Sequence, residues 1–295
     1  MRRPCATWCA RQRPKTRARD DPSRSDASKI WRTTEKRGPG VKPRPRTNSV
    51  VKPGDLLARI ASLDHYRITN SRRCRTRAFS LSSPVDPRKS VSESYDRVAT
   101  DYAARMFHEL DGKPIDRALL DDVATQANGL ICDLGCGPGH IARYLHERGA
   151  VVCGIDISPG MIAQARRLTA GLRFEVGDLR ALSFADETVS AVVAMYSLIH
   201  LDPVELGLAI NEIARVLTRN GIFLAGFHSG HEVRHVDDLW GHRVELDFHF
   251  FEPGEITNAL EAAGLKVTRV VEREPYAGVE VETRRFYTVA AKPGH

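Results

Sequence analysis

Residues 130–140 read LICDLGCGPGH, and residues 151–156, one helical stretch later, read VVCGID. The first segment is an apolar run that enters a glycine-rich turn, and the second is an apolar run that ends in the carboxylate of Asp156. A strand, a glycine turn, a helix and a second strand with a terminal acid are the elements with which a parallel α/β sheet builds a nucleotide pocket. The sequence therefore predicts a ligand site at this turn.

The spacing of the glycines narrows the kind of ligand. A dinucleotide fingerprint is G-x-G-x-x-G and brings a helix N-terminus to a pyrophosphate. Here Gly135, Gly137 and Gly139 alternate, and His140 stands where the fingerprint has its third glycine. Asp133 adds a negative charge, which disfavours phosphates and suits a ligand with a cationic amino group. The turn therefore favours a positively charged nucleoside over a dinucleotide.

The pattern D-x-G-x-G-x-G that begins at Asp133, followed by the acid Asp156, resembles motif I and the next acidic position of the class I S-adenosylmethionine-dependent methyltransferases. Three later segments extend the resemblance: residues 172–179 resemble the third strand with its Gly-Asp pair, residues 191–201 the fourth strand, and residues 222–227 the fifth. The chain has Arg-Asn-Gly before the fifth strand where the family usually has Pro-Gly-Gly, which touches only a turn.

The resemblance implies a role for each polar position around the turn. Gly135, Gly137 and Gly139 let the backbone approach the ligand, since a Cβ would collide with it. Asp133 lies near the methionyl amino group, or it caps the helix that follows the turn. Asp156 accepts hydrogen bonds from the ribose hydroxyls.

Further cofactor contacts follow from the same resemblance. Asp178 accepts from the adenine amino group, or is only a turn residue, and the backbone N–H of Leu179 binds a ring nitrogen. Ile157 and Met161 pack on the adenine and ribose, although Met161 suits the core equally well. Met195 and Tyr95 complete the predicted cofactor-binding set. The implied cofactor is S-adenosyl-L-methionine.

Two segments are expected to close the site. The pattern Tyr95-Asp96-x-x-Ala99-x-x-Tyr102 resembles the N-terminal lid helix of small-molecule members of the family, in which Tyr95 and Tyr102 close over the methionyl end. Two aromatic side chains on the core-facing side of a helix are the alternative. Residues 230–251, which are rich in histidine and aromatic residues, are expected to form the acceptor pocket.

Methyl transfer asks little of acid–base groups, because the sulfonium is already an activated electrophile and positioning lowers the barrier. A base is needed only if the acceptor arrives protonated. His200 and Tyr102 are candidates, but no single catalytic base is assigned. Further candidate histidines lie later in the chain, at His228, His231, His235, His242 and His249. The spacing of the first three is close to that of metal ligands, but no acidic or cysteine partner accompanies them, so no metal site is expected.

The alternation of elements predicts an α/β fold, a Rossmann-like doubly wound sheet. Helices are expected at residues 95–107, 115–127 and 253–263, and late strands at residues 265–271 and 285–291. The resemblance implies a seven-stranded, mostly parallel sheet in the order 3-2-1-4-5-7-6, with strand 7 antiparallel.

Charge divides the chain into two parts. Residues 1–90 hold 24 Lys and Arg against 7 Asp and Glu, whereas residues 91–295 hold 20 against 30. The first part is also rich in Pro and Ser, so we expect a disordered basic tail at 1–90 and a methyltransferase domain at 91–295. A solvated tail, a nucleic-acid arm, a transit peptide and an over-extended translation start are the alternatives for its purpose.

The predicted function is methyl transfer to an O, N or C atom of a small-molecule acceptor. Alternatives are an RNA or other nucleic-acid methyltransferase that uses the tail as an arm, and a non-catalytic S-adenosylmethionine-binding protein. The acidic domain and the absence of an Asp/Asn-Pro-Pro-aromatic motif argue against nucleic acid as substrate of the domain. The chain contains no apolar run of about 18 residues and no CxxC pair. We therefore expect no membrane partner and a cytoplasmic location, and leave the oligomeric state open.

Overall fold

The computed structural model describes residues 87–294. The predicted disorder of the basic tail therefore lies outside the described residues, except at its last few positions. There helix α1 (Pro87–Met106) already begins, ahead of the domain boundary expected at residue 91. That boundary stays a prediction. No helix within residues 87–294 is long and apolar enough to cross a membrane.

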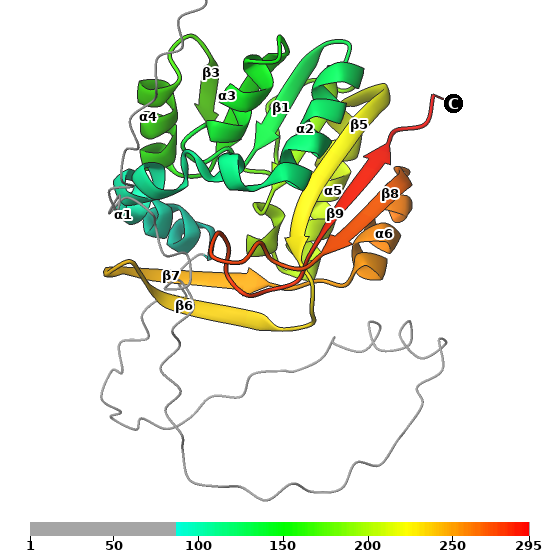
Figure 1. Ribbon diagram of the computed structural model, residues 1–295. Coiled ribbons are helices and arrows are strands. Elements are labelled where there is room, and N and C mark those ends of the chain that lie inside the picture. Colours follow the sequence, from blue (N-terminus) through cyan, green and yellow to red (C-terminus); the bar gives the residue numbers. More distant parts are fainter. Residues whose placement is uncertain (1–86, 295) are drawn as a thin grey trace, which may run out of the picture. The chain divides into compact units, whose positions relative to one another are not determined.

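A seven-stranded sheet forms the centre of the described part of the chain (Figure 1). Its strand order is β3-β2-β1-β4-β5-β9-β8, and only β9 and β8 pair antiparallel to their neighbours. The strands are β1 Leu130–Leu134, β2 Val151–Asp156, β3 Arg173–Val176, β4 Val189–Met195, β5 Leu217–His228, β8 Lys266–Arg273 and β9 Arg285–Ala291. Since β8 and β9 are the sixth and seventh strands of this sheet, the predicted order and the antiparallel last strand are confirmed.

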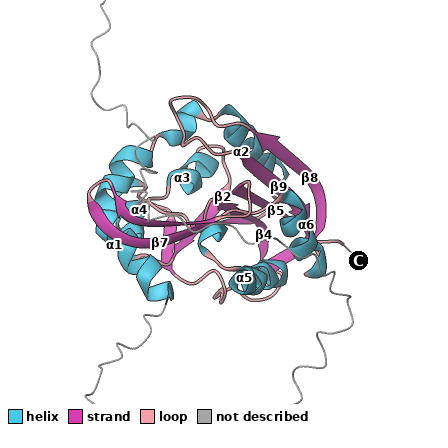
Figure 2. Ribbon diagram, turned by 90° about the horizontal axis from the view of Figure 1, so that it is seen from below, coloured by secondary structure: helices cyan, strands magenta, loops and turns pink. Residues whose placement is uncertain are grey.

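Helices cover both faces of the sheet (Figure 2). Besides α1 they are η2 Glu109–Gly112, α2 Pro114–Gln126, α3 His140–His146, α4 Pro159–Leu168, η3 Leu198–His200, α5 Pro203–Val216 and α6 Pro253–Ala262. Proline at the first position of α2, α4, α5 and α6 suits a helix start, where its missing N–H leaves no bond unmade. Asp202 and Glu205 add a capping box to α5.

Strand β4 contributes apolar side chains to both faces of the sheet, and the helices on each face pack against them. Val192 and Ala194 pack into the core that contains α5 and α6, while Ala191 and Val193 pack into the core that contains α2 and α3. All four side chains are fully buried. A strand that is apolar on both faces is typical of a parallel sheet covered on both sides.

A separate hairpin covers the end of the sheet. Strands β6 (Val233–Leu239) and β7 (His242–His249) are joined by Trp240 and Gly241, both with positive φ, as a two-residue hairpin turn requires. The hairpin packs on α1, where Ser94 Oγ accepts a hydrogen bond from Glu245 N at 2.9 Å. Figure 1 shows α1 and the hairpin lying across the carboxyl ends of the parallel strands. The sequence predicts an acceptor pocket at residues 230–251, but it does not predict that these residues form a hairpin.

Some element boundaries differ from those expected. Helix α1 starts at Pro87 rather than at residue 95. Strand β5 starts at Leu217 rather than at residue 222, because the Arg-Asn-Gly segment forms part of the strand, with Asn220 at a φ of 61° and a register shift opposite β4. The predicted turn is therefore an irregularity within the strand.

Candidate active site

One cavity at the carboxyl edge of the sheet collects nearly all of the predicted site residues. Those that line it are Tyr95, Tyr102, Asp133, Gly135, Gly137, Asp156, Ile157, Met161, Asp178, Leu179, Met195 and His200. Gly139 is the exception, since it packs under the cavity instead of lining it. These residues therefore share one cavity, while their individual roles in cofactor binding stay predictions.

The glycine turn after β1 requires glycine for two reasons. All three glycines have positive φ, at 69°, 52° and 83° for Gly135, Gly137 and Gly139, a region that other residues adopt only with strain. A Cβ on Gly135 would lie 2.2 Å from Ser197 Cβ, and one on Gly139 would lie 2.8 Å from the ring of Phe174. A Cβ added to Gly137 would have Tyr102 Cε1 as its nearest neighbour, at 3.9 Å, so this glycine leaves open space on the cavity side.

Asp156, at the end of β2, holds this turn in place. Its Oδ2 accepts a hydrogen bond from Gly137 N and its Oδ1 one from Ser158 N, both at 2.8 Å. Burial raises the pKa of this carboxyl to about 6. Each oxygen keeps acceptor capacity, because a carboxylate oxygen accepts more than one bond.

Asp133, at the end of β1, serves the helix that follows the turn. Its Oδ2 accepts from Ala142 N in the first turn of α3 at 3.0 Å, which is the capping contact considered from the sequence. The residue also lines the cavity. Burial raises its pKa to about 7, because the buried surroundings disfavour the ionised carboxylate.

Asp178 is engaged by an arginine that sequence reasoning missed. Arg180 donates from Nε to Asp178 Oδ1 at 2.8 Å and from Nη2 to Oδ2 at 2.6 Å, and its Nη1 contacts Glu205 of α5. Such a forked pair fixes both planar groups. Arg180 and Glu205 also line the cavity, so a ligand at Asp178 would meet this ion-pair chain.

Tyr95 and His200 form a hydrogen-bonded pair in the cavity wall. His200 Nδ1 lies 2.9 Å from the carbonyl oxygen of Asp247, which can only accept, so Nδ1 carries the proton. Nε2 then accepts from the Tyr95 hydroxyl at 2.7 Å. Burial lowers the pKa of His200 to about 4, which keeps the imidazole neutral at pH 7.

Tyr102 extends the same wall from α1 to the hairpin. Its ring lies 6.0 Å from that of Tyr95 and 5.8 Å from that of Trp240. The Arg105 guanidinium lies over the Trp240 ring, with its Cζ 5.2 Å from the ring centroid. Leu239, Trp240 and Phe248 bring the hairpin into the cavity lining. These rings cover the site with apolar surface.

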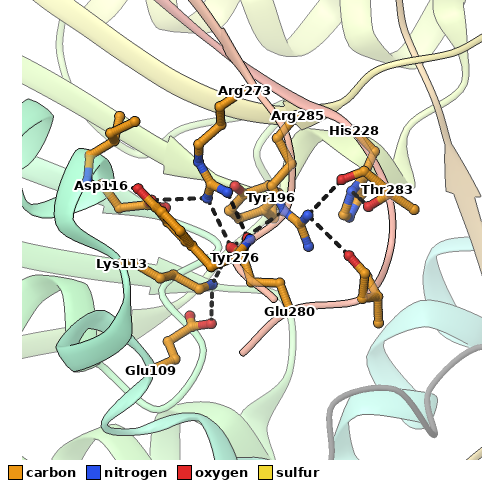
Figure 3. Close-up of polar contacts among 12 residues, drawn as sticks. Glu109, Lys113, Asp116, Tyr196, His228, Arg273, Tyr276, Glu280, Thr283 and Arg285 are labelled. Carbon is orange, nitrogen blue, oxygen red and sulfur yellow. Dashed lines mark hydrogen bonds and ion pairs between the residues drawn. The ribbon is translucent and has the colours of Figure 1, made fainter. Parts of the chain in front are cut away.

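A buried charged group that the sequence does not predict also borders the cavity, and Figure 3 shows its polar contacts. Arg273 binds Glu280 with a fork at 2.6 and 2.9 Å and Asp116 at 3.1 Å, while Lys113 binds Glu109 at 2.5 Å. Further members are Arg285, Tyr196, Tyr276, Tyr287, Thr283 and His228. The group brings residues 109–116 together with residues 273–287. Because these segments lie far apart in the sequence, no local residue spacing predicts the contacts between them.

The histidines considered as ligands or bases do not converge. His228 is buried, with its Nδ1 2.8 Å from Thr283 Oγ1, and burial lowers its pKa to about 3. His235 pairs with Asp247 on the exposed face of the hairpin, and His231 is exposed near Glu252. Within residues 87–294 no group of three or more His, Cys, Asp or Glu side chains has the arrangement of a metal site.

The central part of this chain is similar to a known protein family. Residues 131–221, which span β1 to the middle of β5 and include the glycine turn, match the family model described as "Methyltransferase domain". Residues 131–221 thus carry a methyltransferase domain of the class I S-adenosylmethionine-dependent type. This family uses S-adenosyl-L-methionine as its methyl donor.

A curated relative and two solved structures illustrate the likeness. The malonyl-[acyl-carrier protein] O-methyltransferase of Enterobacter lignolyticus (strain SCF1) is 30% identical over 139 residues, 47% of this chain and 53% of the relative. The chain thus spans about half the length of this curated relative. Magnesium protoporphyrin IX methyltransferase from Synechocystis PCC 6803 has a TM-score of 0.54 at 20% identity, covering 72% of this chain and 99% of that one. The [4+2]-cyclase SpnF has a TM-score of 0.55 at 21% identity, covering 71% and 97%. At these identities the two structures show the fold alone.

Proposed function

We propose that this methyltransferase-family protein is an active enzyme that moves the methyl group of S-adenosyl-L-methionine to an O, N or C atom of a small molecule. The observation that carries the proposal is the meeting of the glycine turn, Asp133, Asp156 and Asp178 at one cavity on the carboxyl edge of the sheet. In open α/β sheets this edge is where ligands bind.

The residues present fit the cofactor. Gly137 leaves an open cradle at the turn, and the buried carboxyls of Asp133 and Asp156 have raised pKa values that a cationic ligand would lower. Asp156 would hold the ribose, Asp133 the methionyl amino group, and Asp178 with the Leu179 N–H the adenine. Ile157, Met161, Met195 and Tyr95 would pack beside them. When bound, the cofactor supplies a methyl group on a positively charged sulfur.

The chain's own contribution is to position the acceptor and to exclude water. Helix α1 and the β6–β7 hairpin cover the cavity with Tyr95, Tyr102 and Trp240. The lowered pKa of His200 makes it a weak base at pH 7, so no general base is assigned, and the hydrogen bond from Tyr95 to His200 Nε2 serves to fix the Tyr95 hydroxyl in the cavity wall.

Three observations support a small-molecule acceptor. The hairpin covers the cavity, residues 91–295 carry an acidic excess that repels a phosphate backbone, and the curated relative described above is named for O-methylation of a small acyl group, malonyl, on its carrier protein. We propose the cytoplasm as the compartment, because Cys132, Cys136 and Cys153 are free thiols.

Transfer of an isotope-labelled methyl group tests the proposal. The full chain is incubated with methyl-deuterated S-adenosylmethionine and either a low-molecular-weight cell extract or total RNA, and products are analysed by mass spectrometry. We expect labelled small molecules that are absent with Asp156→Asn and retained with Asp186→Asn, a change at an exposed carboxylate that pairs with Arg215.

The alternative functions give different outcomes in this experiment. Label in RNA with none in the extract would replace a small-molecule acceptor by a nucleic acid. Binding of S-adenosylmethionine with no label transferred to either fraction would favour a non-catalytic binding protein, because a retained fold and cofactor site do not by themselves give turnover.

A further inference from the structure

The sheet order divides the cavity into two ends. Most of the predicted cofactor residues follow β1, β2 and β3, with Met195 at the end of β4 and Tyr95 on α1, whereas Arg285 and His228 lie opposite each other where β9 begins and β5 ends. Three strand spacings separate β1 from β9 in the order β1-β4-β5-β9, which is about 14 Å at the usual spacing of neighbouring strands. Arg285 therefore lies on the side of the cavity away from the predicted cofactor positions.

Arg285 is a buried cation with incomplete partners. Its side chain is 4% exposed, and its Nη1 donates to the carbonyl oxygens of Val281 and Thr283 at 3.1 and 2.7 Å. Its Nε lies 3.4 Å from Glu280 Oε1 and makes no hydrogen bond. Figure 3 shows the remaining nitrogen, Nη2, without an interaction among the residues drawn, and Nη2 donates to no other residue in the described part of the chain.

The carboxylates around Arg285 are engaged by other cations. Arg273 holds Glu280 with a two-bond fork, and the backbone N–H of Tyr276 donates to Glu280 Oε2 at 3.0 Å. Glu109 is bound by Lys113 at 2.5 Å, and Lys113 reaches Glu280 only at 3.4 Å. Arg285 thus shares Glu280 with Arg273 and Lys113 and has no hydrogen bond to a carboxylate of its own, which leaves it able to bind one further anion.

Aromatic surfaces flank this cation. The Tyr196 ring centroid lies 5.9 Å from Arg285 Cζ and 5.5 Å from Lys113 Nζ. Tyr196 has a φ of 56°, a strained conformation held by hydrogen bonds from its N to Gly226 O and between its hydroxyl and that of Tyr287, both at 3.0 Å. On the other side the His228 ring stacks on Phe250 at 5.2 Å. Flat ring surfaces beside these two cations suit an acid with an unsaturated or aromatic body.

We propose that this end of the cavity binds the carboxylate of the methyl acceptor, with Arg285 as the principal contact and Lys113 as the second cation. The acceptor class is then a small carboxylic acid held against Tyr196. Three carboxylates already offset the three cations of the group, so a single negative charge fits better than the dianion of a phosphate monoester. The inference rests on the proposed function and specifies its substrate class.

Matched acids and amides test this inference without knowledge of the true acceptor. Benzoate, cinnamate and hexanoate are each compared with their primary amides for binding to the full chain, with and without saturating S-adenosylhomocysteine, by ligand-observed NMR. We expect at least one acid to bind 10-fold or more tightly than its amide. Arg285→Gln should remove that preference, Arg285→Lys should keep part of it, and Arg269→Gln, at an exposed arginine on β8, should keep all of it.

The outcomes separate this inference from the proposed function. Amides that bind as well as acids, or no acid binding at all, would overturn the carboxylate site while S-adenosylhomocysteine still binds. An Arg285→Gln variant that stays folded and loses affinity for S-adenosylhomocysteine instead would assign the cation to the cofactor and also overturn the inference. Failure of the wild-type chain to bind S-adenosylhomocysteine would count against the proposed function. The preference for acids over amides would in that case be measured in the samples that contain no S-adenosylhomocysteine.

Discussion

Asp133 makes the stability of the unliganded chain depend on pH. Its pKa is raised to about 7 in the fold by burial, against about 3.9 in an unfolded chain. Between about pH 4 and 7 the folded chain therefore holds a proton that the unfolded chain has lost, so this residue's contribution to the free energy of unfolding falls as pH rises across that window and is constant above it.

Asp133→Asn should remove that contribution, since an amide oxygen can still accept from Ala142 N. We expect the melting temperature of the variant to rise relative to wild type as pH increases from 5 to 8. Thermal denaturation of both proteins at the two pH values measures the difference. A difference that does not change with pH would show that the carboxyl ionises as easily in the fold as in the unfolded chain.

Gly139 shows that the predicted motif has structural as well as ligand-facing positions. It does not line the cavity, and an added Cβ would meet the Phe174 ring at 2.8 Å in a backbone with a φ of 83°. Gly149 has a similar φ of 85° but nothing within 4 Å of the added atom.

We expect Gly139→Ala to lower the free energy of unfolding by at least about 1 kcal/mol more than Gly149→Ala, because only the former adds overpacking to backbone strain. Urea denaturation of the two variants measures this. Equal losses would mean that Phe174 moves aside without cost, and that the motif needs this glycine for its backbone conformation alone.

The hairpin and α1 act together as the cover of the cavity. Tyr102 of α1 and Trp240 of the hairpin lie 5.8 Å apart, so a ligand beneath them should change the surroundings of the indole. We expect S-adenosylhomocysteine to alter the tryptophan fluorescence of the wild-type chain and of Trp31→Phe, but not of Trp240→Phe. The same change in all three proteins would exclude the cover as its source.

At the level of elements, the sequence predicted what is encoded locally. The glycine turn, the apolar strands and the helix-start prolines each specify an element within about ten residues, and the strand order then followed from the resemblance to a known family. The hairpin was not predicted from the sequence. Its strands alternate polar and apolar residues and contain several histidines, a composition that also suits a pocket-lining segment. Its turn at Trp240–Gly241 is a usable signal, since glycine there permits the positive φ of a tight hairpin.

At the level of the whole molecule, the cavity follows from the topology while its far end does not. Parallel strands must bring their carboxyl ends to one edge, so Asp133, Asp156 and Asp178 meet. The charged group around Arg285 depends on pairs such as Arg273 with Asp116, which lie far apart in the sequence, and on the antiparallel return of β9. Only the packed molecule shows that these charges are buried together.

Under the proposed function, the cavity at the carboxyl edge of the sheet binds S-adenosyl-L-methionine. Calorimetric titration of the full chain with S-adenosylmethionine and, separately, with NAD tests it most directly, with Asp156→Asn as the site variant and Asp186→Asn as its matched control. We expect saturable binding of S-adenosylmethionine that weakens at least 10-fold in Asp156→Asn alone, and no binding of NAD. Binding of NAD in place of S-adenosylmethionine, or affinity for S-adenosylmethionine that Asp156→Asn leaves intact, would rule out this cavity as the S-adenosylmethionine site.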